Sequence, residues 1–391
     1  MRSRVAILHI DSFDGATVAD AIHEMLDMLG GLKRIVPRSA HRVLIKPNIV
    51  FGESWDTGIT THPGVIEALI NELRSAGVKV IIGEGPGYGS HGDDVLDAVG
   101  IRDRARHWGV PFYNLKSGEW VRISIPNGKR VHHLTVHKIV PQCDFIISAA
   151  KLKTHCEAIV SLSLKNMKGL IYADAERMRF HTVGLNECLV DLNRMFRPHL
   201  SVVEGLIALE GIGPGRPGKP VKLGVLVAGT DPVAVDAVCT RIMLLEPTIV
   251  AHIKLAADAG LGLIDTERIE IVGERIEDVL PESFEKPPMS IEGISPYECI
   301  QVVDGKPCSN CIVALASFLH AFLKRDAIEN ATAEVRILVG AKAQPMWTGN
   351  ELAIGNCLRR YRGELPWCPG CPPSTMALAE IVIPALRGEL K

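Results

Sequence analysis

The sequence predicts an α/β protein with a mainly parallel sheet flanked by helices, followed by a smaller α/β, cysteine-rich, metal-binding domain. Three observations support this prediction. Short β-branched runs alternate with helix-length segments in the first part of the chain, a stretch rich in Pro, Ser and Glu spans residues 281–296, and six of the ten cysteines follow it. We therefore expect two domains, residues 1–285 and 286–391.

The strands of the first domain are predicted from apolar runs at residues 42–48, 78–85, 144–153 and 222–230, with another at the N-terminus. Segments with helical periodicity separate them, at residues 17–30, 63–76, 92–107, 184–196 and 231–245. Buried strands that alternate with amphipathic helices indicate a parallel sheet covered on both faces. Asp231 precedes Pro232 and is expected to cap a helix. Asp236, inside that helix, is either a buried structural residue or an acid of the site.

The second domain has fewer elements. We expect helices over residues 309–326 and 374–388, with strands over 335–340 and 351–355 between them. The connector at 281–296 has no periodicity, which is typical of a link between domains.

Composition argues against some classes of partner. The 43 basic and 45 acidic residues give a net charge of −2, so no global field favours nucleic acid or an anionic membrane. Asp11 and Asp14 interrupt the apolar run near the N-terminus, and no run approaches the roughly 20 residues needed to span a bilayer. We expect a cytoplasmic protein with reduced thiols or metal-bound cysteines.

The cysteines of the second domain form a metal-binding pattern. Two C-x2-C pairs, Cys308 with Cys311 and Cys368 with Cys371, are accompanied by Cys357 and Cys299. Two-residue spacers let both sulfurs of a pair face one centre, and Cys311 and Cys371 each precede a predicted helix, whose N-terminus stabilises thiolates. We expect Cys308, Cys311, Cys357 and Cys371 to bind, with Cys368 and Cys299 as substitutes or ligands of a second centre.

A 4Fe-4S cluster is the favoured cofactor and zinc is the alternative. A zinc ribbon needs the same thiolates, but its pairs usually lie about 15 to 20 residues apart, much closer than here. Residues 369–373, Pro-Gly-Cys-Pro-Pro, resemble the ligand loop of the small subunit of nickel–iron hydrogenases and of its relative in respiratory complex I. In those proteins the cysteine of this loop holds a 4Fe-4S cluster, so the resemblance implies the same role for Cys371.

Polar loops follow three predicted strands of the first domain, at residues 46–48, 83–87 and 151–155. Ligands of open parallel sheets bind at the carboxyl ends of strands, so these loops are expected to converge on a cationic pocket for an anionic small molecule or cofactor. The alternative is that the lysines are ordinary solvated residues. The residues expected to bind the cofactor are Lys46, Asn48, Gly85, Gly87, Lys151, Asn166 and Lys168.

Catalysis is assigned to His62, His155, Lys153 and Lys165, because both histidines adjoin strand ends and could transfer protons. Residues 87–92 also fit G-x-G-x-x-G. That match alone is weak evidence for a dinucleotide, since no acidic ribose ligand clearly follows it.

Taken in order, these motifs resemble the domain of unknown function 362 family, over about residues 1–270. The motifs that carry the resemblance are residues 46–48, 61–63, the glycine loop after Glu84, 151–155, 163–169 and 231–236. The resemblance implies an associated iron–sulfur module. The tail lacks the compact C-x2-C-x2-C-x3-C run of ferredoxins, so ferredoxin geometry does not carry over.

Three functions fit the sequence. The first is a redox enzyme or electron-transfer component that acts on an anionic small molecule and exchanges electrons with a redox partner protein. The second is a nonredox isomerase or lyase in which the metal is a Lewis acid or structural. The third is a metallocofactor maturation protein that donates metal or electrons.

Overall fold

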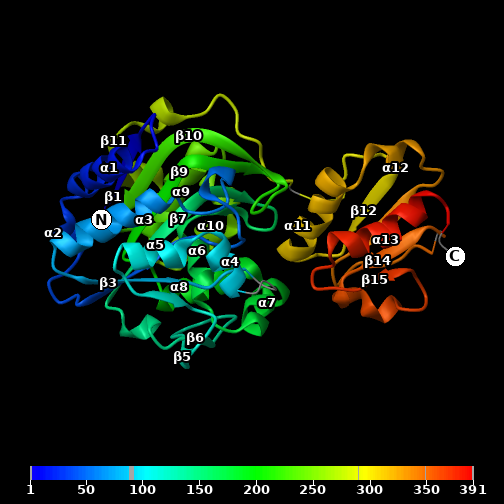
Figure 1. Cartoon of the computed structure of the whole chain (residues 1–391), viewed down its shortest axis with the longest axis horizontal. Coiled ribbons are helices and arrows are strands. Elements are labelled where there is room, and N and C mark those ends of the chain that lie inside the picture. Colours follow the sequence, from blue (N-terminus) through cyan, green and yellow to red (C-terminus); the bar gives the residue numbers. More distant parts are fainter. Residues whose placement is uncertain (1, 88–91, 289, 348, 390–391) are drawn as a thin grey trace. The chain divides into compact units, whose positions relative to one another are not determined.

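The computed structural model describes residues 2–87, 92–288, 290–347 and 349–389, and the chain in it forms two units (Figure 1). The first unit consists of Met1–Thr154, Val160–Glu210 and Lys219–Glu285. The second consists of His155–Ile159, Gly211–Gly218 and Lys286–Lys391. The second unit thus includes two short segments from the earlier part of the chain, which the sequence did not indicate.

A nine-stranded sheet forms the centre of the first unit, with strand order β11-β1-β10-β9-β7-β2-β3-β4 and β8 paired with β7. The strands are β1 (Ser3–His9), β2 (Arg42–Lys46), β3 (Lys79–Glu84), β4 (Phe112–Asn114), β7 (Phe145–His155), β8 (Ile159–Ser161), β9 (Leu200–Gly211), β10 (Gly218–Gly229) and β11 (Ile269–Gly273). The pairings β11–β1, β9–β7, β7–β2, β2–β3 and β3–β4 are parallel, whereas β1–β10 is antiparallel. The predicted α/β class with a mainly parallel sheet is confirmed.

The helices of this unit are α1 (Gly15–Met28), α2 (Leu32–Ile35), α3 (Pro63–Ser75), α4 (Gly92–Ala98), α5 (Ile101–His107), α6 (Ser163–Asn166), α7 (Asp174–Val183), α8 (Leu185–Met195), α9 (Pro232–Ile242) and α10 (Ala251–Asp258). The helix expected at 92–107 is divided into α4 and α5 at Gly100, whose φ of 66° takes the chain out of the helical region. An antiparallel hairpin, β5 (Trp120–Ser124) and β6 (His133–His137), completes the unit.

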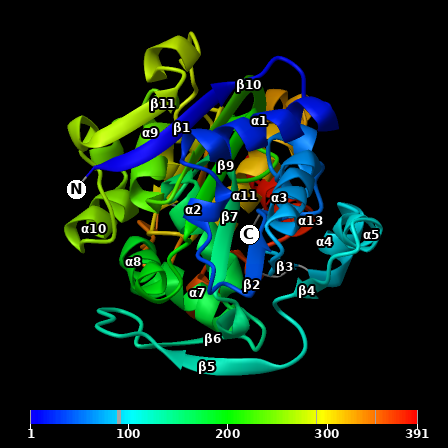
Figure 2. The ribbon, with the colours of Figure 1, turned by 90° about the vertical axis from the view of Figure 1, so that its left-hand side faces the viewer.

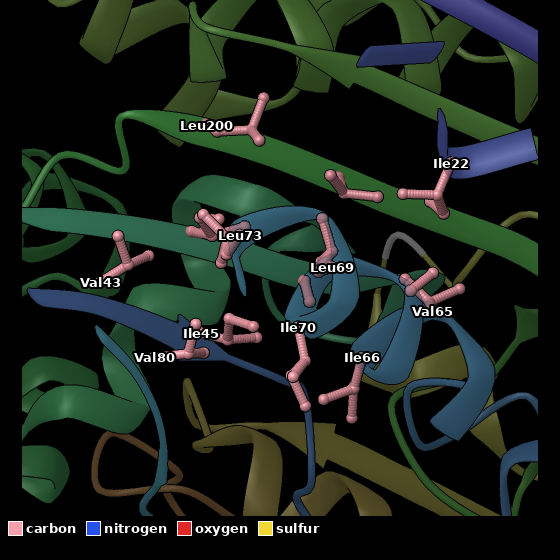
Figure 3. Close-up of a cluster of buried hydrophobic side chains, with 14 of the residues drawn as sticks. Ile22, Val43, Ile45, Val65, Ile66, Leu69, Ile70, Leu73, Val80 and Leu200 are labelled. Carbon is pink, nitrogen blue, oxygen red and sulfur yellow. The ribbon is translucent and has the colours of Figure 1, made fainter. Parts of the chain in front are cut away.

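Alternate residues of the strands build the core beneath α1 and α3, which pack beside each other (Figure 2). Val43 and Ile45 of β2 point to this face, where they meet Leu69 and Leu73 of α3 (Figure 3). Their neighbour Leu44 is buried but does not belong to this cluster, as the two-residue period of a strand requires. Because both faces of the sheet are packed in apolar surroundings, the sheet is held in the core and its strand ends have defined positions.

Helix starts follow their sequence signals. Asp231 caps α9 by accepting hydrogen bonds from the backbone NH groups of Val233 and Ala234, which confirms its predicted role. His62 caps α3 through Nδ1, which accepts from the NH of Gly64. Both helices have Pro at their first position.

The second unit is built on a four-stranded parallel sheet with order β12-β13-β14-β15. Its strands are β12 (Ile300–Asp304), β13 (Val335–Val339), β14 (Glu351–Ile354) and β15 (Trp367–Cys368), and its helices are α11 (Ser309–Ser317), α12 (Arg325–Glu329) and α13 (Thr375–Leu386). A π-helical turn, Phe318–Phe322, follows α11, so the helix expected at 309–326 is interrupted. In the part of the chain that the structure describes, no helix is long and apolar enough to cross a membrane.

Candidate functional site

Lys46, the last residue of β2, lies in a buried polar network. Its ammonium group donates to both carboxylate oxygens of Glu84, at 3.0 and 2.9 Å, to the carbonyl of Pro47 at 2.9 Å and to Oδ1 of Asn166 at 3.1 Å. The side chains of Lys46 and Glu84 are 1% and 2% exposed. Burial lowers the pKa of Lys46 and raises that of Glu84, and their pairing opposes both shifts. The cation predicted for the pocket is thus paired with a carboxylate.

The predicted binding residues Asn48 and Asn166 join the same network. Asn48 Nδ2 donates to Asn166 Oδ1 at 3.1 Å, and Asn166 Nδ2 donates to the carbonyl of Lys46 at 3.1 Å. Glu84 also accepts from the NH groups of Ile49 and Gly85, at 3.0 and 2.7 Å. The structure therefore brings Lys46, Asn48, Gly85 and Asn166 together from the ends of β2, β3 and α6.

Gly169 lets the segment after α6 approach this ion pair. A Cβ atom there would lie 2.6 Å from Lys46 Nζ and would also clash with Glu84, so only glycine fits. Arg177 of α7 fixes the same place by donating to the carbonyls of Gly169, Gly85 and Pro86. The glycine loop is thus held from two sides.

Lys151 of β7 forms a second buried ion pair, with Glu204 of β9. Lys151 Nζ lies 2.8 Å from Glu204 Oε1, and both side chains are fully buried. The same carboxylate accepts from the backbone NH groups of His62 and Leu206. Burial lowers the pKa of Lys151 and raises that of Glu204, against the effect of the pairing.

His62 sits beside this pair, and its ring meets that of Trp55 edge-on at 4.1 Å between centroids. Burial, with smaller effects from the charges of Lys151 and Arg104, lowers the pKa of His62 to about 4. The imidazole is neutral near pH 7, where Nδ1 accepts the helix-capping hydrogen bond.

Lys153 differs from the other two lysines. It is fully buried, and its Nζ donates to the carbonyl of Ile59 at 2.8 Å, but no carboxylate among the described residues forms an ion pair with it. Burial first, then the charges of Lys165 and Lys151, lower its pKa well below the ordinary value. A neutral amine at this position could act as a base or nucleophile.

Asp236 anchors α6, which carries Asn166 and Lys165. Its two oxygens accept from the NH groups of Ser163 and Leu164 at 2.8 and 2.9 Å. Burial raises the pKa of Asp236 to about 8. Of the two roles expected from the sequence, the buried hydrogen-bonded one matches these contacts.

The remaining predicted residues lie around this network or in the second unit. Lys168 contacts His181 at 2.5 Å, between Nζ and Nε2, and the NH of Gly87 donates to the carbonyl of Val50. Residues 88–91 of the glycine motif lie outside the described residues. His155 belongs to the second unit, where its Nδ1 accepts from the NH groups of Glu157 and Ala158.

Sequence reasoning missed the acidic partners and the arginine. Glu84 and Glu204 each follow an apolar strand run, and such an isolated acidic residue was the available signal. Arg177 gives no comparable signal, because its partners are carbonyl groups.

The predicted cysteine ligands come from three strand ends of the second unit. Cys308 precedes α11 and follows β12, Cys311 lies in the first turn of α11, Cys357 follows β14, and Cys371 lies between β15 and α13. Because the sheet is parallel, these loops share one edge.

The same four thiols interact with one another. Cys308 and Cys311 are joined by a side-chain hydrogen bond, which lowers the pKa of Cys308 to about 6 and raises that of Cys311. The charges of Cys357 and Cys371 also raise the pKa of Cys311. Among the described residues, no group of three or more His, Cys, Asp or Glu side chains is arranged to hold a metal ion.

Gly355 leaves space between two of these sulfurs. A Cβ atom at this position would lie 3.5 Å from Cys311 Sγ and 3.7 Å from Cys357 Sγ. The backbone φ of Gly355 is 89°, which residues other than glycine rarely adopt. Cys368 and Cys299 behave differently. Burial raises the pKa of both, to about 11 for Cys368, and neither shift has any of the four thiols among its causes.

Residues 43–241 match the family described as domain of unknown function (DUF362). The chain belongs to this family. The DUF362 match includes both buried ion pairs and ends before the cysteine-rich part of the chain.

A relative of this DUF362 protein is a thylakoid-associated protein of Synechocystis sp.. The two are 28% identical over 271 residues, which cover 68% of this chain and 82% of the relative.

Proposed function

We propose that this protein holds a 4Fe-4S cluster and serves as a redox enzyme or electron-transfer component that acts on an anionic small molecule or cofactor. The observation that supports the proposal is the convergence of Cys308, Cys311, Cys357 and Cys371 from three loops at one sheet edge. A 4Fe-4S cluster has four thiolate ligands and transfers single electrons.

The donor set fits a cluster chemically. Cys308 accepts hydrogen bonds from the backbone NH groups of Asn310 and Cys311 at the start of α11. Such donors stabilise sulfur-centred negative charge. Burial raises the pKa of the Cys357 thiol, and the nearby guanidinium of Arg360 opposes that shift. The role of these residues would be to hold the cluster and lower its net negative charge.

The redox partner proposed for this cluster is a small acidic electron-transfer protein. Cys357 is exposed, and the segment after it presents Arg359, Arg360 and Arg362 to solvent. A positive surface beside a cluster ligand steers an acidic partner to a short transfer distance. We expect reversal of charge at Arg359 and Arg362 to slow cluster reduction by such a protein at least tenfold at low salt, and the control Arg325→Glu to leave the rate unchanged.

The test is anaerobic purification with iron and acid-labile sulfide analysis and EPR. We expect a brown protein whose cluster reduces and reoxidises reversibly. Cys371→Ser should lose the signal, whereas Cys368→Ser, three residues away, and Cys143→Ser in the first unit should keep it. A colourless protein with stoichiometric zinc would overturn the proposal. An intact cluster without an accessible redox transition would instead support a nonredox isomerase or lyase.

A further inference from the structure

A basic surface lies at the edge of the nine-stranded sheet where its parallel strands begin. Arg42 and Lys79 are the first residues of β2 and β3, Arg2 directly precedes β1, and Arg268 directly precedes β11. Because β2 and β3 are parallel, as are β1 and β11, the starts of paired strands share an edge. Lys46 ends β2, so its buried network lies at the opposite edge. The basic surface is therefore separate from the candidate site described above.

Two adjoining cavities hollow this edge, with volumes of about 780 and about 1260 Å³. Pro37, just after α2, lines both of them, and the neighbouring residues Asp144 and Phe145 line one each. Small-molecule sites range over about 300–1,000 Å³. The two cavities together exceed that range and suit an extended ligand.

Basic side chains dominate the lining of the smaller cavity. It includes Lys33, Arg38, Arg42 and Lys79, and Asp144 supplies the carboxylate among its described residues. That carboxylate already accepts hydrogen bonds from the backbone NH groups of His41 and Arg42, at 2.8 and 2.9 Å. In the described part of the chain, none of the four basic side chains forms an ion pair.

The larger cavity is lined by five arginines, Arg2, Arg4, Arg34, Arg197 and Arg268. Its carboxylates are those of Asp231 and Glu270. Asp231 is occupied as the cap of α9 and as the acceptor of a hydrogen bond from Ser3, and Glu270 pairs with Arg4 at 3.0 Å. The two cavities thus combine nine basic side chains with three carboxylates, which leaves a large local excess of positive charge.

This local excess differs from the net charge of the chain, which is −2. Charges in water are screened over about 8 Å at physiological ionic strength, so a ligand at this edge responds to the nearby cations and not to the whole molecule. The argument from net charge against a polyanionic partner therefore does not apply at this surface.

The side chains and the shape favour a nucleic acid over a lipid bilayer. Seven of the nine basic residues are arginines, whose planar guanidinium group binds phosphate through two parallel hydrogen bonds. A bilayer surface does not enter a hollow, and proteins that bind it usually insert large apolar side chains. Among the described residues, the exposed large hydrophobic side chains, such as Met195 and Trp120, line neither cavity.

We propose that this edge of the sheet binds the phosphodiester backbone of a nucleic acid, with the arginines and lysines of both cavities pairing with successive phosphates. The proposal goes beyond the proposed function and does not depend on it. No exposed Phe, Tyr or Trp is found among the described residues of the lining, since Phe145 is 2% exposed. Bases therefore lack a stacking platform of that kind, and we expect little sequence preference.

The test is fluorescence anisotropy of the full chain with a labelled RNA of about 20 nucleotides and, separately, with its duplex, which distinguishes the two sources of phosphate. We expect binding at low salt that weakens as salt rises. Each phosphate contact contributes about −0.7 to the slope of log affinity against log salt for a single strand, so about five contacts give a slope near −3.5.

One pair of changes in each cavity tests the surface. Arg38→Gln with Lys79→Gln, and Arg197→Gln with Arg268→Gln, should each weaken binding at least tenfold and make the salt slope shallower by about 1. All four side chains are exposed, so the variants should fold. The matched control is Arg122→Gln with Lys129→Gln, which removes the same charge from exposed positions that line neither cavity. Its affinity should stay within twofold of the wild type.

Several outcomes would overturn the inference. These are no binding of either nucleic acid, binding that does not change with salt, and equal weakening by the control pair. Vesicles that contain phosphatidylglycerol are tested with the same variants. Binding to these vesicles but not to nucleic acid would also overturn the inference and would assign the basic surface to a membrane.

Discussion

The buried lysines of the first unit lie at the end of β2 and within β7, the clustered cysteines of the second follow strand ends, and the two sets interact with different kinds of partner. Lys46 and Lys151 each form an ion pair with a glutamate of a neighbouring strand, with Nζ to carboxylate-oxygen distances of 2.9 and 2.8 Å. The four cysteines interact with one another: the hydrogen bond with Cys308, followed by burial, raises the pKa of Cys311, and burial, followed by the charge of Cys308, raises that of Cys357. The charges of Lys46 and Lys151 are thus paired within the chain, whereas the four thiols are the proposed ligands of a cluster.

Removal of iron from the proposed cluster should have the largest effect and should destabilise the second unit alone. Metal binding to a thiolate site contributes directly to folding, so a chelator should lower the stability of the second unit by several kcal/mol and leave the first unchanged. Hydrogen exchange of β13 compared with β2 measures this. The Cys368→Ser protein, with its cluster intact, is the control, and equal protection of β13 with and without iron would contradict the comparison.

Lys151→Met should be the most damaging single change among the lysines. It leaves Glu204 buried without its partner, which costs about 3–5 kcal/mol of unfolding free energy. Urea denaturation measures the loss. The double variant Lys151→Met with Glu204→Gln should recover part of it, and a loss under about 1 kcal/mol would show that the pair is not a closed unit.

His62 should make the first unit sensitive to acid. Because its pKa falls from 6.5 to about 4 on folding, the unfolded chain binds the proton more tightly. The stabilisation is complete above about pH 6.5 and is lost as pH falls toward 4, by at most about 1.4 kcal/mol per pH unit. His62→Asn, which can still cap α3, should reduce this slope in denaturation measured from pH 7 to 4. The exposed control His133→Asn should keep it.

Lys153→Met should change stability least. Since no described carboxylate pairs with Lys153, the change leaves no buried charge uncompensated and removes one hydrogen bond, to Ile59. Because the buried carbonyl of Ile59 loses this donor, we expect the unfolding free energy to fall by about 1–3 kcal/mol in the same urea measurement. A loss as large as that of Lys151→Met would mean that Lys153 has an equivalent partner.

Much of the fold could be predicted because its signals are local. The period of two in β2 and the Asp231–Pro232 start of α9 specify an element without knowledge of its neighbours. The division at Gly100 and the π-helical turn after α11 depend on packing around each segment, and the sequence did not reveal them.

The sequence allowed us to predict the lysines of the candidate site but not the carboxylates that pair with them. Lys46 was located correctly at a strand end, whereas Lys151, expected in a loop after its strand, lies within β7 because that strand continues to His155. Whether each lysine meets a carboxylate depends on which strands become neighbours. Glu204 lies on β9, over fifty residues from Lys151, and only the β7–β9 pairing brings it there. The cysteine ligands, the cluster and the catalytic roles remain predictions.

The contact between Glu157 and the start of α11 has a consequence for how this protein can be dissected. Glu157 accepts from the NH of Ser309 at 2.8 Å, beside Cys308, although 152 positions separate the two residues along the chain. A recombinant fragment that begins at residue 286 would lack this carboxylate and the 211–218 segment. The second unit is therefore discontinuous in sequence, and expressing it apart from the first unit would require all three of its segments, His155–Ile159, Gly211–Gly218 and Lys286–Lys391.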